Sequence, residues 1–263
     1  VETVDAVPAN TKLIDVYDGK VSMESFVASL DDTQLANLAN GISGASTSGD
    51  TWGADANSVT GAAGETSQLY FNSLGIPNTV EADGPAGIRV TAETTDKDGN
   101  AVYNYCTAFP IGTLLAQTWN TDLVNRVGKA IGEEMVEIGV TLWLAPGMNI
   151  HRDPLCGRNF EYYSEDPLIT GKMAAAITEG CQSKGVSITL KHFTTNNKET
   201  NRNSSDSRVS ERALREIYLK GFEIAVKEAQ PWSIMTSYNF LNGIETSENK
   251  DLLTNITRGE WGY

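Results

Sequence analysis

The chain has 263 residues, of which 40% are apolar, and a formal net charge of −14 with a sequence pI near 4.6. This length and apolar content suit one large domain or two small ones with a substantial buried core. The acidic balance excludes a polyanion partner, because nucleic-acid binding requires clustered lysine and arginine that release counterions. A neutral substrate fits better, and no nucleic-acid partner is expected.

The sequence offers little support for a metal, a disulfide framework or a membrane segment. Cys106, Cys156 and Cys181 have no CxxC spacing and predict buried thiols. The two histidines, His151 and His192, lack a second ligand at helical or finger spacing, so no metal is expected. No cofactor is expected either. No stretch approaches the ~20 apolar residues of a membrane helix. A soluble protein without a membrane partner is predicted, and its compartment, cytoplasmic or secreted, stays open.

The N-terminal part predicts little regular structure. Residues 1–40 are interpreted as a linker and lead-in, with one short helical pattern around Asp32 to Asn40. From Gly41 to Gly64 the chain is rich in Gly, Ser, Thr, Asp and Ala, with Trp52 as the one large apolar residue. That composition predicts a long ordered loop or a lid.

Strand-like apolar runs alternate with amphipathic helical patterns in the rest of the chain. From Thr121 to Ile138 one apolar stripe includes Ile131 and Met135, and Gly139 follows as the expected helix end. The other predicted helices run from Pro167 to about Lys184 and onward from a cap at Ser210, and the predicted strands are residues 78–82, 140–145, 186–190 and 232–236. This alternation predicts βαβ units around a parallel sheet.

Polar and charged residues follow each predicted strand at its carboxyl end. In a closed parallel barrel these ends meet on one face, where the active site is built. Asp, Arg, Lys, His and Tyr at equivalent strand ends are the residue types that a ligand with several hydroxyl groups requires. The segments concerned are Asp83-Gly84-Pro85, the loop through Arg158 and Glu161, Lys191-His192-Phe193, and Ser237-Tyr238-Asn239.

Structural readings of these residues stay open. Asp83 before Gly84-Pro85 is also what a turn requires, and Arg158 with Glu161 is also what a local ion pair on a loop requires. The polar run from residue 194 to 206 is typical of an exposed loop. Lys191-His192 is harder to explain structurally, because charged residues at the end of a buried strand are costly unless they are solvated or functional.

Five ordered segments stand out along the chain: Glu81 to Arg89, Gly157 to Pro167, Lys191 to Phe193, Asn196 to Glu199 and Ser237 to Asn239. In order and spacing they resemble the N-terminal barrel of glycoside hydrolase family three. The resemblance covers roughly residues 60 to 263. It implies an α/β fold in which residues 41–263 form most of a (β/α)8 TIM-type catalytic barrel. About five strand–helix units are recognisable against the eight of a closed barrel, so the barrel is expected to be incomplete within this chain.

The resemblance implies a β-glucosidase that hydrolyses terminal non-reducing β-D-glucosyl residues by a retaining double displacement. A carboxylate can accept from two adjacent hydroxyls while lysine and arginine donate to others, and such bonds to charged groups are worth about 1.5–3 kcal/mol each. Glu161 and Glu165 receive structural roles. The implied substrate-binding residues are Asp83, Arg158, Lys191, His192 and Tyr238, with Arg89 and Met235 in supporting positions.

Neither catalytic carboxylate is expected within this chain. In the family that it resembles, the nucleophilic Asp follows shortly after a Gly-aromatic pair like Gly262-Tyr263, and the general acid comes from another domain. The chain alone is therefore expected to be inactive and prone to aggregation. The partners implied are a β-glucoside or cello-oligosaccharide substrate and an α/β sandwich domain of the same protein, and a homo-oligomer stays open.

Rival functions also remain open. A β-xylosidase or another exo-β-glycosidase of the family is an alternative, although Asp rather than Glu at position 83 suits a hexose better. An N-acetylglucosaminidase is disfavoured, because residues 194–199 lack the His-Asp pair of such enzymes. A sugar-binding protein without catalysis is the alternative from another class. If the chain proved active alone, Glu161, Glu165 and Asp153 would be the first carboxylates to re-examine.

Overall fold

The structure is a computed structural model that describes residues 4–41, 58–66, 68–95 and 98–263. The chain divides into two compact units, Val1–Ala82 with Val90–Asn104 and Asp83–Arg89 with Tyr105–Tyr263. Residues 42–57 of the predicted loop or lid, including Trp52, lie outside the described residues. The division predicted at residue 40 stays a prediction.

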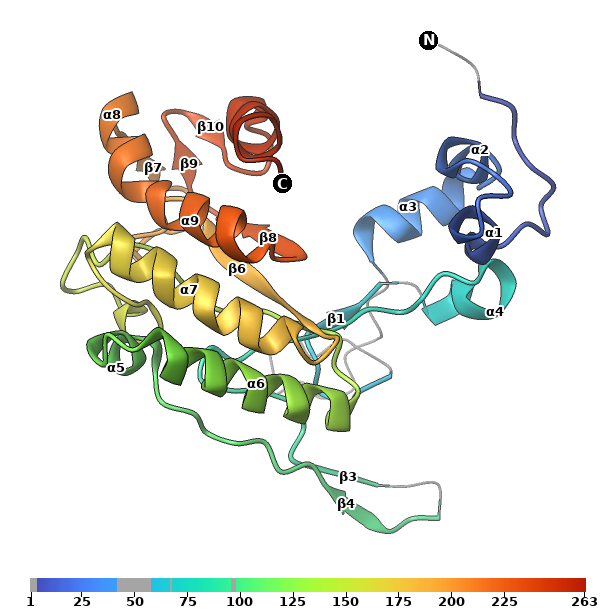
Figure 1. Cartoon of the computed structure of the whole chain (residues 1–263), viewed down its shortest axis with the longest axis horizontal. Helices are drawn as coiled ribbons and strands as arrows, with labels where there is room; N and C mark the ends of the chain where they lie inside the picture. The colour runs from blue at the N-terminus through green and yellow to red at the C-terminus, as the bar shows by residue number, and fades with distance from the viewer. Residues whose placement is uncertain (1–3, 42–57, 67, 96–97) are drawn as a thin grey trace. The chain divides into compact units, whose positions relative to one another are not determined.

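The first unit consists of short helices and two antiparallel strand pairs (Figure 1). The helix predicted around Asp32 to Asn40 is confirmed, and two shorter helices precede it where only a lead-in was expected. Buried Phe26, Tyr70 and Leu74 form the small core of this unit. The elements are α1 (Leu13–Tyr17), α2 (Met23–Ala28), α3 (Asp32–Asn40), β1 (Gly64–Glu65), a 3₁₀ turn (Gln68–Tyr70), α4 (Phe71–Leu74), β2 (Val80–Ala82), β3 (Glu93–Thr95) and β4 (Ala101–Tyr103).

The second unit contains a parallel sheet in which strands alternate with helices. Strands β5 (Leu142–Trp143), β6 (Ser187–Phe193) and β8 (Ser233–Thr236) lie in that order, and β6 pairs in parallel with both neighbours. All seven residues of β6 are buried, as expected for the central strand of a covered parallel sheet. The four predicted strands are thus confirmed as β2, β5, β6 and β8, with ends that differ by a few residues.

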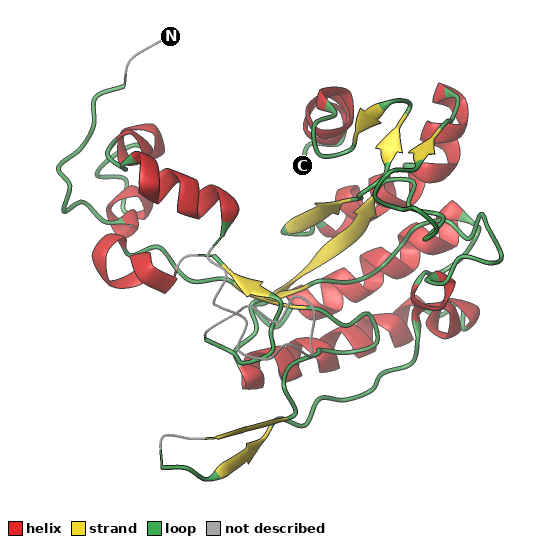
Figure 2. Ribbon diagram, turned by 180° about the vertical axis from the view of Figure 1, so that it is seen from behind, coloured by secondary structure: helices red, strands yellow, loops and turns green. Residues whose placement is uncertain are grey.

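Three long helices lie side by side on one face of this sheet: α6 (Thr121–Ile138), α7 (Pro167–Gln182) and α9 (Lys220–Ala229) (Figures 1 and 2). Glycines let α6 and α7 approach closely. A Cβ at Gly128 would lie 2.4 Å from the carbonyl oxygen of Ile177, and one at Gly180 would lie 2.1 Å from that of Asn125. Among the described residues, no helix has both the length and the apolar character needed to cross a membrane.

The predicted helix boundaries hold well in this unit. Helix α6 has the predicted bounds and ends at Gly139 with φ 89°, and Ser210 caps the third helix by accepting a hydrogen bond from Ala213 N at 3.3 Å. That third helix is not continuous, because a π-helical turn separates its first turn from α9. Ile131 and Met135 of the predicted stripe are buried, and α6 also buries Val124, Gly128 and Gly132.

Smaller elements complete the second unit. Strand β9 pairs in parallel with β7 and antiparallel with β10. Cys156 and Cys181 are buried as predicted, whereas Cys106 is only half-buried. The remaining elements are α5 (Gly112–Gln117), a 3₁₀ turn (Asn159–Glu161), β7 (Asp206–Ser207), α8 (Glu211–Ala213), the π turn (Leu214–Tyr218), β9 (Phe240–Leu241), β10 (Ile244–Glu245) and a terminal π helix (Asp251–Glu260). The predicted α/β class is therefore confirmed.

Candidate functional site

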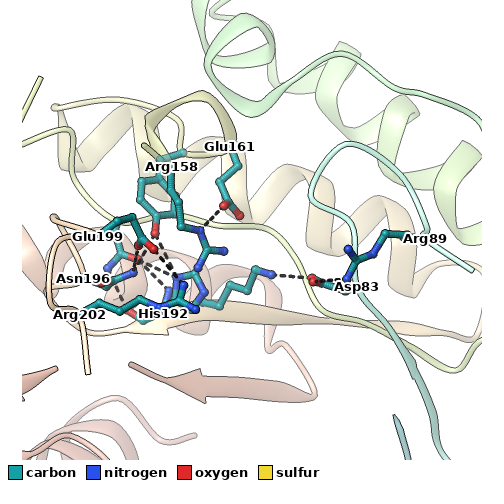
Figure 3. Close-up of polar contacts among 11 residues, drawn as sticks. Asp83, Arg89, Arg158, Glu161, His192, Asn196, Glu199 and Arg202 are labelled. Atoms are coloured by element: carbon teal, nitrogen blue, oxygen red, sulfur yellow. Dashed lines mark hydrogen bonds and ion pairs between the residues drawn. The ribbon is translucent and has the colours of Figure 1, made fainter. Parts of the chain in front are cut away.

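Polar side chains gather at the carboxyl ends of β5 and β6 and on the loops that follow them (Figure 3). Asp83, Arg158 and His192 lie on three separate segments, yet they belong to one region of the second unit. Parallel strands deliver their carboxyl ends to one edge of the sheet, which explains why residues so distant in sequence meet here.

Asp83 is held between two cations. Its Oδ1 accepts a hydrogen bond from Lys191 Nζ at 2.9 Å, and its Oδ2 accepts one from Arg89 at 3.2 Å. The Lys191 side chain is 4% exposed, whereas that of Asp83 is 35% exposed. Burial would raise the pKa of Asp83, but the neighbouring Lys191 ammonium outweighs burial, and the pKa lies below its ordinary value. Asp83 is therefore a carboxylate that retains a solvent-facing side.

The loop that carries Asp83 is anchored to the buried sheet. The indole nitrogen of Trp143, in β5, donates a hydrogen bond to the carbonyl oxygen of Gly84 at 2.6 Å. Within the loop, Asp83 and Arg89 form an antiparallel bridge, with Arg89 N donating to Asp83 O at 2.8 Å. These contacts fix the backbone on both sides of the carboxylate. Asp83 is thus more than the turn former considered from sequence.

Arg158 is paired with a buried carboxylate three residues further along. Its Nε donates to Oε1 of Glu161, whose side chain is 3% exposed. Burial would lower the pKa of Arg158, but the hydrogen bond to Glu161 raises it instead. Since Nε is the bonded nitrogen, the outer guanidinium nitrogens remain to donate elsewhere. Figure 3 shows this pair beside His192.

The turn that carries Arg158 and Glu161 rests on helix α5. The hydroxyl of Thr113 lies 2.8 Å from the carbonyl oxygen of Asn159 and 2.9 Å from that of Tyr162. A Cβ at Gly112 would lie only 2.3 Å from the carbonyl oxygen of Glu161, so the helix and the turn are in direct backbone contact. Helix α5 therefore packs directly against the backbone of the turn that carries Arg158.

His192 is buried and held on both its backbone and its ring. Asn149 bonds both backbone groups of His192, accepting from its N at 2.9 Å and donating to its O at 2.8 Å. The ring nitrogen Nδ1 lies 3.2 Å from the hydroxyl of Tyr162, and the two rings meet edge to face. Burial, together with the charges of Arg158, Lys191 and Arg202, lowers the pKa of His192 well below 6.5. The imidazole is therefore neutral at neutral pH.

A chain of polar contacts leads from Tyr162 to Tyr238. The amide nitrogen of Asn196 donates to the Tyr162 hydroxyl at 3.2 Å and to Glu199 at 3.0 Å. Glu199 accepts from Arg202 at 2.9 Å, and the guanidinium carbon of Arg202 lies 5.2 Å from the centre of the Tyr238 ring. The Tyr238 side chain thus borders the same network, although Tyr238 is itself exposed.

Six of the seven residues expected in the site make side-chain contacts in this region, in three groups: Asp83 with Lys191 and Arg89, Arg158 with Glu161, and the network that leads from His192 to Tyr238. The exception is Met235, which is half-buried in β8 and meets the site through the backbone pairing of β8 with Lys191. Glu165 is exposed and Asp153 accepts a hydrogen bond from Leu155 N in a local turn, so neither lies in the polar network.

Several members of the network were not singled out from the sequence. Thr194, Thr195 and Asn196 are buried, so the expectation of an exposed loop is wrong at the start of the run from 194 to 206. The cause is hydrogen bonding inside the fold: Ser237 donates to the carbonyl oxygen of Thr194 at 2.8 Å, Asn239 donates to the Thr195 hydroxyl at 3.0 Å, and the amide nitrogen of Asn196 is bonded as described above. The missed residues are Trp143, Asn149, Tyr162, Asn196, Glu199 and Arg202; three of these, Tyr162, Asn196 and Glu199, lie inside segments that carried the family resemblance.

The arrangement supplies both hydrogen-bond donors and acceptors without a clustered metal-ligand set. Lys191, Arg89 and Arg158 can only donate, whereas the Asp83 carboxylate can only accept. Within the described ranges, no three His, Cys, Asp or Glu side chains gather as metal ligands would. A neutral ligand bearing several hydroxyl groups matches such a mixture, because each hydroxyl can both donate and accept.

Comparisons with known proteins identify relatives of this chain. The family model described as the glycosyl hydrolase family 3 N terminal domain matches residues 65–263. β-Glucosidase A of Butyrivibrio fibrisolvens is 48% identical over 252 residues, which make up 96% of this chain and 28% of that protein. The exo-α-(1→6)-L-arabinopyranosidase of Bifidobacterium longum is 49% identical over 195 residues, 73% of this chain and 25% of that protein.

A solved structure gives the same family relationship. The structure of β-glucosidase 3B from Thermotoga neapolitana in complex with glucose is 56% identical, with a TM-score of 0.74 over 78% of this chain and 28% of that one. The chain spans about a quarter of the length of the relatives that it matches. With the family model covering most of its length, the chain belongs to glycosyl hydrolase family 3, as a member that carries the N-terminal domain of that family.

Proposed function

We propose that this chain supplies the sugar-binding part of a retaining β-glucosidase acting on terminal non-reducing β-D-glucosyl residues. The observation that carries the proposal is the contact of Lys191 with Asp83 at the strand ends, beside Arg158 and His192. The β-glucosidases among its relatives, including one solved with glucose, support the same substrate class.

The proposed contacts follow from hydrogen-bond chemistry. Asp83 accepts from two neighbouring hydroxyls of the sugar, since its pKa keeps it ionised and its side chain is partly open. Lys191 and Arg158 donate to hydroxyl oxygens through the N–H groups that their carboxylate partners leave available. His192 bonds a further hydroxyl, and Tyr238, Arg89 and Met235 line the surroundings.

The carboxylates of this region are proposed to bind and orient rather than to attack. Asp83 is bonded to Lys191 and Arg89, Glu161 to Arg158, and Glu199 to Arg202. A retaining mechanism uses a nucleophile and an acid about 5–5.5 Å apart. Both are proposed to come from outside these 263 residues, together with the strands that complete a (β/α)8 barrel and an α/β sandwich domain.

The test is hydrolysis of an aryl β-D-glucoside by the full-length protein, with the anomeric configuration of the first product followed by NMR. Release of β-glucose is the expected result, and release of α-glucose would overturn the retaining mechanism. Glucose binding measured by calorimetry, without turnover of the glycoside, would instead favour a sugar-binding protein.

A second candidate is hydrolysis of an α-L-arabinopyranoside. It is favoured by the 49% identity with the Bifidobacterium longum enzyme. The aryl α-L-arabinopyranoside and the aryl β-D-xyloside belong in the same assay as the glucoside. A kcat/KM higher for either of these than for the glucoside would replace the proposed substrate.

A further inference from the structure

The amide of Asn149 has only one orientation that fits its surroundings. Its Oδ1 lies 2.9 Å from the backbone nitrogen of His192, and its Nδ2 lies 2.8 Å from the backbone oxygen. Rotating the amide by half a turn would bring NH2 against N–H and oxygen against oxygen. The backbone of His192 thus identifies which amide atom is the acceptor, although oxygen and nitrogen differ little in shape.

This acceptor also faces the imidazole ring. Oδ1 of Asn149 lies 3.3 Å from His192 Nδ1, so the same oxygen approaches both the backbone and the ring of one residue. A lone pair on Nδ1 would point at a carbonyl oxygen with no proton between them. A proton on Nδ1 converts that contact into a hydrogen bond.

The second neighbour of Nδ1 accommodates the same proton. The Tyr162 hydroxyl lies 3.2 Å from Nδ1 and accepts from Asn196 Nδ2 on another side. Its oxygen has a second lone pair that can share the Nδ1 proton with Asn149. Two acceptors, one at the long end of the usual distance range and one just beyond it, are the geometry of a shared, three-centre hydrogen bond.

The far nitrogen of the ring is left for a ligand. Nε2 of His192 makes no hydrogen bond to any residue in the described ranges. Burial, together with the charges of Arg158, Lys191 and Arg202, keeps the pKa of the ring low. A neutral ring carries one proton, so a proton on Nδ1 leaves a lone pair on Nε2.

We propose that Asn149 is a positioning residue that holds His192 as the Nδ1-protonated tautomer, so that Nε2 accepts a hydrogen bond from a hydroxyl of the bound ligand. The identity of that ligand as a sugar rests on the proposed function. The other hydrogen-bonding groups of the site agree with this tautomer, because Lys191 and Arg158 are donors and an acceptor is needed beside them. A hydroxyl that accepts from Lys191 or Arg158 has its own proton free, and an acceptor nitrogen can receive that proton.

The direct test is a long-range ¹H–¹⁵N correlation spectrum of the full-length protein labelled with ¹⁵N-histidine, at neutral pH. The His192 signals are assigned by their loss in His192→Gln. The expected spectrum has a pyrrole-type shift at Nδ1 and a pyridine-type shift at Nε2. The reverse assignment in the wild-type protein would overturn the proposal without any activity measurement, so it is independent of the proposed function.

Two variants separate the roles of the neighbours. Tyr162→Phe should keep the Nδ1 proton, because Asn149 still accepts it. Asn149→Leu removes the acceptor, and the Tyr162 hydroxyl can then donate to Nδ1, so the signals should move to the Nε2-protonated pattern. An unchanged tautomer in a folded Asn149→Leu protein would show that Asn149 does not set it.

Ligand binding gives the matching functional readout. If glucose binds, Asn149→Leu should weaken it by about tenfold, which is the loss of one buried hydrogen bond. The Nε2 shift of the wild-type protein should move on addition of glucose, as expected when a lone pair accepts a proton. A shift unchanged at saturating glucose would contradict the role given to Nε2, even if the tautomer were the expected one.

Discussion

Lys191 Nζ lies 2.9 Å from Asp83 Oδ1, although 108 positions separate the two residues in the sequence. The Lys191 side chain is almost completely buried and that of Asp83 is not, so the carboxylate faces both the protein interior and solvent. Toward the sheet it neutralises a buried ammonium, and toward solvent its lone pairs stay exposed. Replacing Asp83 should therefore affect both stability and activity.

Asp83→Ala in the full-length protein should lower kcat/KM on an aryl β-D-glucoside by roughly a hundredfold or more, because about 3 kcal/mol of charged hydrogen bonding is lost. It should also lower the free energy of unfolding by about 1–3 kcal/mol, because Lys191 is left without its counter-charge. Urea unfolding and initial rates measure the two effects.

An exposed ion pair provides the control for Asp83→Ala. Lys172 and Glu228 are bonded at 2.6 Å with both side chains more than 40% exposed. Lys172→Ala should change stability by about 0.5 kcal/mol or less and leave the rates unchanged. Wild-type efficiency in Asp83→Ala would show that Asp83 does not bind the sugar.

Glu161 should prove to be a supporting residue rather than the nucleophile. Glu161→Gln keeps an acceptor for Arg158 Nε, so kcat/KM should fall by about tenfold, mainly through a higher KM. Glu161→Gly should lose more, and added azide should not restore activity, since azide rescues only the loss of a catalytic carboxylate. Recovery of activity with azide would identify Glu161 as a catalytic group.

His192 predicts a pH dependence of stability. Its pKa in the folded protein lies well below 6.5, so below pH 6.5 the unfolded chain takes up a proton that the folded protein excludes. This contribution to stability is complete above pH 6.5 and is lost as the pH falls, with a limiting slope of about 1.4 kcal/mol per pH unit. His192→Gln should show a shallower slope between pH 6.5 and 5 in urea unfolding. Parallel slopes for the two proteins would contradict the expectation.

Local sequence signals predict the helices and strands around this site better than they predict its side-chain contacts. Helix α6 has the bounds predicted from its stripe and from Gly139, and β6 was recognisable as an apolar run that ends in Lys191-His192. Asn149 carries no such signal, because its role depends on a hydrogen bond to a residue 43 positions away. The first two helices could not be predicted, because five or six residues are too few to show a clear hydrophobic periodicity.

The candidate-site residues at strand ends could be predicted from the sequence, whereas the contacts of those on loops could not. Those at strand ends could be proposed because alternation of strands and helices fixes where the strands end. Tyr162 and Arg202 could not be assigned contacts, since the path of the loops between strands depends on tertiary packing. Asp83 was equally consistent with a turn, and only the buried partner Lys191 distinguishes the two readings.

Gly112→Ala should damage the protein far more than its size suggests. A Cβ there would lie 2.3 Å from the carbonyl oxygen of Glu161, so the helix and the turn must move apart. The expected cost is about 2–4 kcal/mol in unfolding free energy, with a raised KM because Arg158 moves with the turn.

Gly157 offers a matched control close in sequence to the same turn. A Cβ at Gly157 would meet no atom within 4 Å, so Gly157→Ala should cost about 1 kcal/mol or less. Equal stabilities of the two alanine variants would show that helix α5 and the turn are not in the tight contact described.

The contact of α5 with the Arg158 turn also bears on protein engineering. Gly112 and Thr113 contact backbone carbonyl oxygens of the turn. Any effect of these two residues on a bound ligand would therefore be transmitted through the backbone. Libraries that vary only side chains facing the ligand would leave this support untouched. Changes at Thr113 that shorten or lengthen its side chain would shift the Arg158 guanidinium without altering its chemistry, and under the proposed function they offer a way to adjust sugar preference from behind the site.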